Sequence, residues 1–173
     1  MEAKELDICI TFYNTDLEMF KNTINSVLNQ KNKNFNLILL NDGSTNKNLD
    51  TYVKNLISKP HDIDIEYHTR ENKGTMYGRI ELSEYAVSPY IHFMDSDDIL
   101  FENATEIMIK NIHNNIFKKT NVDIIQFEFE YFKKNISYNI DGKNDSYIGY
   151  KENVTENKND VLDLLMRDIV GLK

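Results

Sequence analysis

The sequence predicts an α/β fold in which helices cover both faces of a mostly parallel sheet. Short apolar segments alternate along the chain with segments whose apolar residues recur at helical spacing, which is typical of β-α-β units. The segment 35–41, FNLILLN, is apolar along most of its length, as expected for a strand that is covered on both faces. Polar clusters follow three of the predicted strands, which indicates loops that all lie at one edge of the sheet.

The first half of the chain contains two predicted strand–helix pairs. Residues 6–13 form a short apolar segment with β-branched residues, which favours a strand. Thr15 or Asp16 can cap the helix that follows, whose apolar residues recur at helical spacing as far as Leu28. After the strand at 35–41 and the turn sequence DGSTN, a second helix is expected at 47–58. Its apolar face would consist of Leu49, Tyr52, Val53, Leu56 and Ile57.

Two further strand–helix pairs are expected next. Residues 63–68 alternate between apolar and polar side chains, as a half-buried strand does. The polar loop TRENKGT separates them from a helix at 76–86. A fourth strand, 89–94, ends at a group of aspartates and precedes a helix at 101–117.

The last part of the chain reads as one strand, one polar segment and one helix. The segment 122–132 alternates clearly from Gln126 onward and is expected to be a strand. Residues 135–150 are polar and are expected to form a hairpin or an irregular loop, followed by a short helix at 161–170.

Composition limits the class of function. The 173 residues carry a formal net charge of −8, which disfavours non-specific binding to nucleic acid phosphates. The single cysteine, Cys9, excludes a disulfide framework and favours a reducing compartment. Residues 1–14 contain no long apolar region of the signal-peptide type, and no segment is long enough to span a bilayer. We therefore expect a cytoplasmic protein that does not bind nucleic acid and has no transmembrane segment.

The acidic segment FMDSDDIL, residues 93–100, indicates a metal site. Asp95 and Asp97 are two residues apart at a predicted strand end, where they would share a face and repel each other unless a cation stabilises them. Carboxylate oxygens suit Mg²⁺ or Mn²⁺, and substrate phosphates commonly complete the coordination of such an ion. The pattern thus indicates a divalent cation that bridges a diphosphate. The alternative is an Asp-rich helix N-terminus stabilised by the helix dipole, which suits Asp98.

The other polar clusters contain candidate ligand-binding residues. Asp42, at the end of a buried strand, can accept hydrogen bonds from a base or from ribose hydroxyls, although Asp-Gly-Ser is also common in ordinary turns. Gly74 allows the backbone to approach a ligand closely. Arg79 can pair with a phosphate, and the alternative is a solvated surface arginine.

Taken in order, these segments resemble glycosyltransferase family 2, whose members have the Rossmann-like GT-A fold. The resemblance covers about residues 6–130 and rests on ICITFYN, INSVLNQ, NDGST, the set Asn72, Gly74 and Arg79, and the acidic run Asp95 to Asp98. Thr11 stands where the family usually has Pro, Asn41 where it has Asp, and Gly78-Arg79-Ile80 where it has Ala-Arg-Asn. These departures leave the acidic groups intact.

The resemblance implies a donor site for a nucleotide-diphosphate sugar, with UDP as the expected nucleotide. Tyr13 and Asp42 would contact the base, and Thr11 would line the same pocket through its backbone. Arg79 would lie near the base or the diphosphate.

The metal and the sugar would lie at the other end of this site. Asp95 would reach the ribose or the sugar, and Asp97, with Asp95, would ligate Mn²⁺ or Mg²⁺. Asn14, Gly74 and Ser96 are the further donor-site residues that the family motifs carry over.

The resemblance also implies inverting transfer to a saccharide or lipid-linked glycan acceptor, in the synthesis of polysaccharides or surface glycans. Such a reaction requires a general base, which in the family lies well downstream of the acidic motif. The acidic residues after 131 read as solvated surface: Asp141, Asp145, Glu152 and Glu156. We expect the base to lie beyond residue 173. We therefore expect one GT-A domain over 1–173, with a donor-binding core at 6–130 and an incomplete acceptor side at 131–173. Such a domain should bind donor and metal but transfer sugar poorly. A peripheral position at the inner face of the membrane is compatible with a lipid-linked acceptor.

Two rival enzyme classes lack the motifs that they need, and one non-enzymatic alternative stays open. A sugar nucleotidyltransferase would need a Gly-rich, basic loop after the first strand, and TFYNTDLEMF contains neither Gly nor a basic residue before the helix. A dinucleotide-binding domain would need G-x-G-x-x-G at the same place, and this motif is absent. A catalytically degenerate module of the same fold, used for nucleotide or protein binding, is the non-enzymatic alternative.

Overall fold

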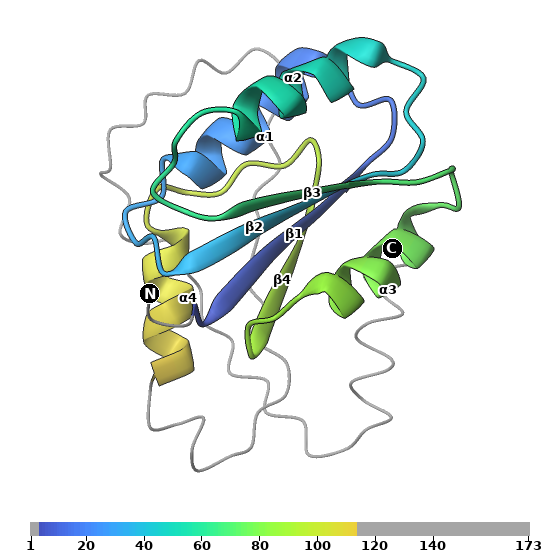
Figure 1. The fold of residues 1–173 in the computed structure, drawn as a ribbon. Coiled ribbons are helices and arrows are strands. Elements are labelled where there is room, and N and C mark those ends of the chain that lie inside the picture. Colours follow the sequence, from blue (N-terminus) through green and yellow to red (C-terminus); the bar gives the residue numbers. More distant parts are fainter. Residues whose placement is uncertain (1–3, 114–173) are drawn as a thin grey trace, which may run out of the picture. The chain divides into compact units, whose positions relative to one another are not determined.

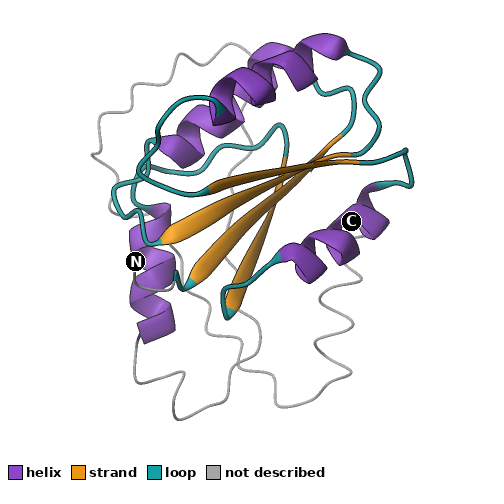
Figure 2. Ribbon diagram, viewed as in Figure 1, coloured by secondary structure: helices purple, strands orange, loops and turns teal. Residues whose placement is uncertain are grey.

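The computed structural model describes residues 4–113, which alternate between strands and helices (Figures 1 and 2). The strands are β1 (Leu6–Phe12), β2 (Phe35–Asn41), β3 (Ile65–Thr69) and β4 (Tyr90–Asp95). The helices are α1 (Leu17–Leu28), α2 (Lys47–Ile57), α3 (Thr75–Tyr85) and α4 (Ala104–His113). All of them belong to the first of two compact units, Met1–Ile116. The elements expected between 122 and 170 lie outside the described residues.

The four strands form one parallel sheet in the order β3-β2-β1-β4. This confirms the predicted α/β class. The parallel register places Thr11 between Leu40 of β2 and Asp95 of β4. The carboxyl ends of these three strands therefore lie side by side.

The two faces of the sheet are covered by different helices. Helices α1 and α2 lie on one side and α3 on the other (Figure 1). On the α1 side, the ring centroids of Phe12 and Phe20 lie 4.5 Å apart, and Phe20 also meets Tyr52 of α2 edge to face. On the α3 side, Leu82 packs in a buried cluster with Cys9, Ile38 and Leu40. Because successive side chains of a strand point to opposite faces of the sheet, neighbouring residues pack in two different cores.

Polar caps define where the helices begin. The carboxylate of Asp16 accepts hydrogen bonds from the backbone N–H groups of Glu18 and Met19 and so caps α1, as one of the two predicted alternatives. Asn46 caps α2 through the N–H of Asn48. Helix α3 has Gly74 at this position, with a φ of 91° that favours glycine, and Gly74 offers no side-chain cap.

A second kind of polar contact holds the far end of α3. Asp7, fully buried in β1, accepts hydrogen bonds from the backbone N–H groups of Val87 and Ser88 in the loop after α3. Its carboxylate also accepts from the hydroxyl of Ser88 and the amide of Asn36. Four donors satisfy this carboxylate, so it serves the fold at the edge where the strands begin.

Several predicted boundaries and faces differ from the structure. The third strand was expected at 63–68 but forms at Ile65–Thr69, with Ile63 buried in the preceding loop. The fourth helix begins at Ala104 rather than at 101, after a segment that supplies backbone contacts to the end of α1. Ile57, expected on the apolar face of the second helix, is 41% exposed, and the apolar side chain of Met19 in α1 is 38% exposed. The spacing of apolar residues predicts which face of a helix is apolar. It does not predict how much of that face the neighbouring elements cover.

Candidate functional site

The structure brings the three predicted polar clusters together at the carboxyl edge of the sheet. Thr11, Leu40 and Asp95 are neighbours in register, and the backbone N–H of Asp42 donates to the carbonyl of Phe12 at 2.9 Å. The loops after β1, β2 and β4 therefore meet here, as the topology rule for open α/β sheets predicted.

Asn14 joins the loop after β1 to the loop after β2. Its backbone lies in the left-handed region with φ of 50°, which asparagine tolerates better than most residues. Its side-chain oxygen accepts hydrogen bonds from the backbone N–H groups of Thr45 and Asn46, at 2.8 and 3.2 Å. Its own N–H donates to the hydroxyl of Ser44. In the structure Asn14 therefore orders two site loops.

Ser96 joins the acidic loop to the first strand–helix connection. Its hydroxyl lies 2.7 Å from the hydroxyl of Thr15. Its carbonyl accepts a hydrogen bond from the hydroxyl of Thr23 on α1, at 3.0 Å. The acidic loop is thus held against α1, which fixes the start of the segment that contains the aspartates.

The carboxylate of Asp42 is buried and fully engaged. Its Oδ1 accepts from Arg70 Nε at 2.6 Å and from the N–H of Lys73 at 3.0 Å, and its Oδ2 accepts from the N–H of Gly74 at 2.8 Å. Burial by itself would raise the pKa of Asp42, but the hydrogen bonds from Arg70, Lys73 and Gly74 outweigh it and lower the pKa. The base contact expected of Asp42 stays a prediction, and in the structure this side chain holds the loop before α3.

Arg70 is a site residue that the sequence reasoning missed. It lies directly after β3 in the loop TRENKGT, and its guanidinium group donates to Asp42, to Glu81 of α3 at 2.7 Å and to the carbonyl of Gly74 at 3.0 Å. A lone arginine immediately after a strand, at the same edge as a buried aspartate, is the signal that could have identified it.

Arg79 and Asp95 form a second ion pair at the same edge. Arg79 Nη2 donates to Asp95 Oδ1 at 2.8 Å, which links α3 to the end of β4. The side chains are 34% and 57% exposed, so both groups can be reached from solvent. The structure thus brings the predicted phosphate-binding arginine to Asp95, one of the two predicted metal-binding carboxylates.

The chain turns directly after Asp95, with a hydrogen bond of 3.3 Å from the N–H of Asp98 to the carbonyl of Asp95. Asp97 therefore lies in a turn, and the prediction that Asp95 and Asp97 share a strand face is wrong.

Partial burial raises the pKa of Asp98, and the negative charges of Asp95 and Asp97 add to this effect. Helix α4 begins only at Ala104, so these carboxylates do not cap it. Within residues 4–113, no group of three or more His, Cys, Asp or Glu side chains is arranged as a metal site.

Thr11 and Gly78, two of the positions at which the sequence departs from the family pattern, lie in contact. A Cβ atom on Gly78 would lie 2.6 Å from Thr11 Cγ2 and 2.8 Å from Thr11 Oγ1, so α3 approaches β1 closely only because residue 78 is glycine. The Thr11 hydroxyl is buried without a hydrogen-bond partner among the described residues. Tyr13, the predicted base-binding residue, follows β1 and is 51% exposed.

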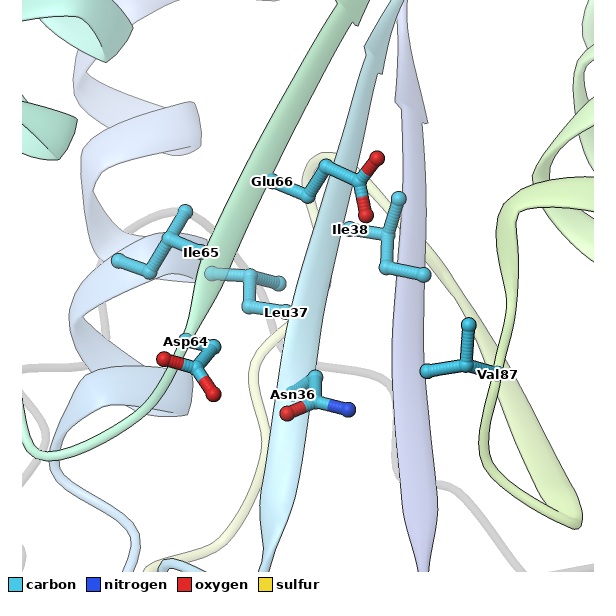
Figure 3. Close-up of a pocket in the computed structure, with 7 residues that line it drawn as sticks. All are labelled: Asn36, Leu37, Ile38, Asp64, Ile65, Glu66 and Val87. Carbon is cyan, nitrogen blue, oxygen red and sulfur yellow. The ribbon is translucent and has the colours of Figure 1, made fainter. Parts of the chain in front are cut away.

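A hollow of about 200 Å³ lies elsewhere, where the strands begin, and Figure 3 shows its side chains. It is lined by Asn36, Leu37, Ile38, Asp64, Ile65, Glu66 and Val87. None of the predicted donor-site residues lines it, so it is separate from the candidate site.

Comparison with known proteins identifies relatives of this chain. The family model described as glycosyl transferase family 2 matches residues 7–163. An uncharacterized glycosyltransferase of Rickettsia bellii is 35% identical over 64% of this chain and 16% of its own length. The teichoic acid poly(glycerol phosphate) polymerase of Staphylococcus epidermidis is 31% identical over 77% of this chain and 20% of its own length. The chain therefore spans a fifth or less of these two relatives.

Solved structures of other proteins share the fold. S. aureus TarS residues 1–349 in complex with UDP has a TM-score of 0.54 and 19% identity, covering 63% of this chain and 32% of that one. The mannosyltransferase PcManGT of Pyrobaculum calidifontis, solved with GDP-Man and Mn²⁺, has a TM-score of 0.55 and 11% identity, covering 65% and 33%. None of the helices within residues 4–113 is long and apolar enough to cross a membrane.

Proposed function

Because this chain belongs to glycosyl transferase family 2, we propose that the carboxyl edge of its sheet binds a nucleotide-diphosphate sugar, with UDP as the nucleotide. The observation that carries the proposal is that exposed Tyr13 follows β1 at the same sheet edge where Arg79 pairs with Asp95 of the acidic run. An aromatic ring can stack on a base, and a guanidinium group can pair with a diphosphate. Structural neighbours of the same fold hold UDP, UDP-GlcNAc and GDP-Man.

The acidic loop fits a divalent cation, Mn²⁺ or Mg²⁺. Asp95 and Asp97 offer hard carboxylate oxygens, and with Asp98 they place three carboxylates within four residues, whose mutual repulsion a cation would relieve. When bound, such an ion acts as a Lewis acid that stabilises negative charge on a departing diphosphate. The protein itself contributes Arg79, whose guanidinium group lies beside Asp95 and would stabilise the charge of the same diphosphate.

The reaction we propose is inverting transfer of the sugar to a saccharide or lipid-linked glycan acceptor in the cytoplasm or at the inner face of the membrane. The anomeric carbon would be displaced directly through an oxocarbenium-like transition state. The general base that deprotonates the acceptor hydroxyl lies outside residues 4–113 in this proposal. A role in surface-polymer synthesis is supported by the similarity to a teichoic acid polymerase.

A nucleotide-binding module without transfer activity is the second candidate. The observation in its favour is that Arg79 already pairs with Asp95, one of the two proposed metal ligands. If this pair does not open, nucleotide can still bind at Tyr13 but without a metal at Asp95. The two candidates therefore differ in whether the binding of nucleotide depends on the metal.

Calorimetric titration of UDP, with and without Mn²⁺, tests the proposal. Wild type should bind UDP more tightly with Mn²⁺, and Asp97→Asn should lose this gain. Asp64→Asn removes the same charge at the other end of the strands and should behave as wild type. UDP binding that is equal with and without Mn²⁺ would favour the second candidate, and no binding by a folded wild-type chain would contradict a donor site formed by these residues.

A further inference from the structure

Helix α3 is held at both ends by buried aspartates that accept two backbone N–H groups each. At its start, Asp42 accepts from Lys73 and Gly74. After its end, Asp7 accepts from Val87 and Ser88. The two aspartates differ in their remaining partners, because Asp7 also accepts from the Ser88 hydroxyl and the Asn36 amide, whereas Asp42 is bound by the guanidinium group of Arg70.

Arg70 connects this arginine–aspartate pair to the body of α3. Its side chain is 8% exposed, and its three nitrogen atoms donate to three different acceptors: Asp42, Glu81 on α3 and the carbonyl of Gly74. A guanidinium group makes such a fork of contacts, and an ammonium group of lysine cannot reproduce its geometry. The loop and the first turns of α3 are thus fixed against the end of β2.

The same helix carries Arg79, which reaches Asp95 at the end of β4. Gly78 lies close against Thr11 of β1, since a Cβ atom there would be 2.6 Å from Thr11 Cγ2. The position of Arg79 over the acidic loop therefore depends on where the start of α3 is held. We propose that Arg70 is a positioning residue of the donor site, which acts through Asp42 and Gly74 on α3 and so places Arg79 beside Asp95. This inference rests on the function proposed above.

Amide hydrogen exchange tests the positioning without any ligand. In Arg70→Lys, the amides of Lys73 and Gly74 should exchange faster, while those of Val87 and Ser88 keep their wild-type rates. Asp7→Asn is the matched control, since it should produce the reverse pattern at the other end of the same helix. If Arg70→Lys is poorly folded, Glu81→Gln serves instead, because it weakens one of the three contacts and leaves the buried pair in place. Unchanged exchange at Lys73 and Gly74 in a folded Arg70 variant would overturn the proposal.

Titration with UDP and Mn²⁺ then tests the consequence for the site. Arg70→Lys should weaken binding by about tenfold or more, as expected for a residue that supports ligating groups, and Asp7→Asn should leave it near wild type. In an Arg79→Gln background the further loss from Arg70→Lys should shrink to about twofold or less, because the two residues act on one contact. A purely structural role would give equal losses in both backgrounds, which would contradict the proposal. If wild type binds no UDP, the function proposed above fails, and the exchange pattern still decides whether Arg70 positions α3.

Discussion

Two aspartate–arginine pairs lie at the same edge of this sheet and differ in almost every physical property. Asp42 and Arg70 are 2% and 8% exposed and share their contacts with two backbone N–H groups, a carbonyl and Glu81. Asp95 and Arg79 are 57% and 34% exposed and are joined by one contact of 2.8 Å.

The difference indicates separate roles for the two pairs. Removing one partner of a buried pair leaves an uncompensated charge and is strongly destabilising, so such a pair stays closed. An exposed pair contributes little to stability, so a ligand can replace either partner at a small free-energy cost. The buried pair therefore suits support of the loop before α3, and the exposed pair suits exchange with a diphosphate and its cation.

The largest expected effect is a difference in the loss of folding stability when the arginine of each pair is replaced. Arg70→Met should lower the free energy of unfolding by about 3–5 kcal/mol, because it leaves Asp42 buried without its cation. Arg79→Met should lower it by less than about 1 kcal/mol. Urea unfolding of both variants measures the difference. Equal losses would show that exposure does not distinguish the pairs.

The next effect concerns the packing beneath the buried pair. Gly78→Ala should cost about 1–3 kcal/mol, because its Cβ would overlap Thr11 and lie 3.3 Å from Arg70 Nη2. Thr11→Ala removes the atoms that this Cβ would meet, so the double variant should recover part of the loss. A double-mutant cycle from thermal or urea unfolding gives the coupling, and additive losses would contradict the contact.

Asn14 is intermediate between the buried and the exposed pair, because its side chain is exposed but accepts hydrogen bonds from backbone N–H groups. Asn14→Gly loses the contacts to Thr45 and Asn46 but keeps a relaxed backbone at φ of 50°. Asn14→Ala loses the same contacts and adds left-handed strain, so it should be less stable than Asn14→Gly by about 1 kcal/mol. Similar unfolding midpoints for the two variants would mean that the loop relaxes out of this conformation.

The smallest effect is a difference in pH dependence between the pairs. Asp42 has a lowered pKa, so the stability it contributes is present above its unfolded pKa and is lost as the pH falls through its folded pKa. Asp98, in the exposed cluster, has a raised pKa and the opposite sign, so its contribution is lost as the pH rises through its folded pKa. Asp98→Asn should therefore be more stable than wild type near neutral pH, by less than about 1 kcal/mol after solvent screening, and should match it in acid. A gain that persists at low pH would exclude this electrostatic cause.

Much of this fold could be predicted because its signals are local. The uniform apolar run of β2, the cap at Asp16 and the turn at Asp42 each depend on a few adjacent residues. Alternation of strands and helices then implied a parallel sheet and a common edge for the polar clusters, which the register of β1, β2 and β4 confirms. Boundaries were less accurate, as at β3, because they depend on where neighbouring elements stop pairing.

The sequence by itself determined the fold class, the family and the sheet edge at which the acidic residues gather. The tertiary structure decided which aspartate is buried in an ion pair and which is exposed to solvent, since that depends on partners far along the chain. Asp42 is buried in its ion pair because Arg70, 28 positions away, packs against it. Asp95 is exposed because its partner Arg79 is itself near the surface. Asp7 is likewise satisfied by Val87 and Ser88, 80 and 81 positions away. Carboxylates with the same chemistry thus acquire different roles from burial and from the donors that folding brings to them.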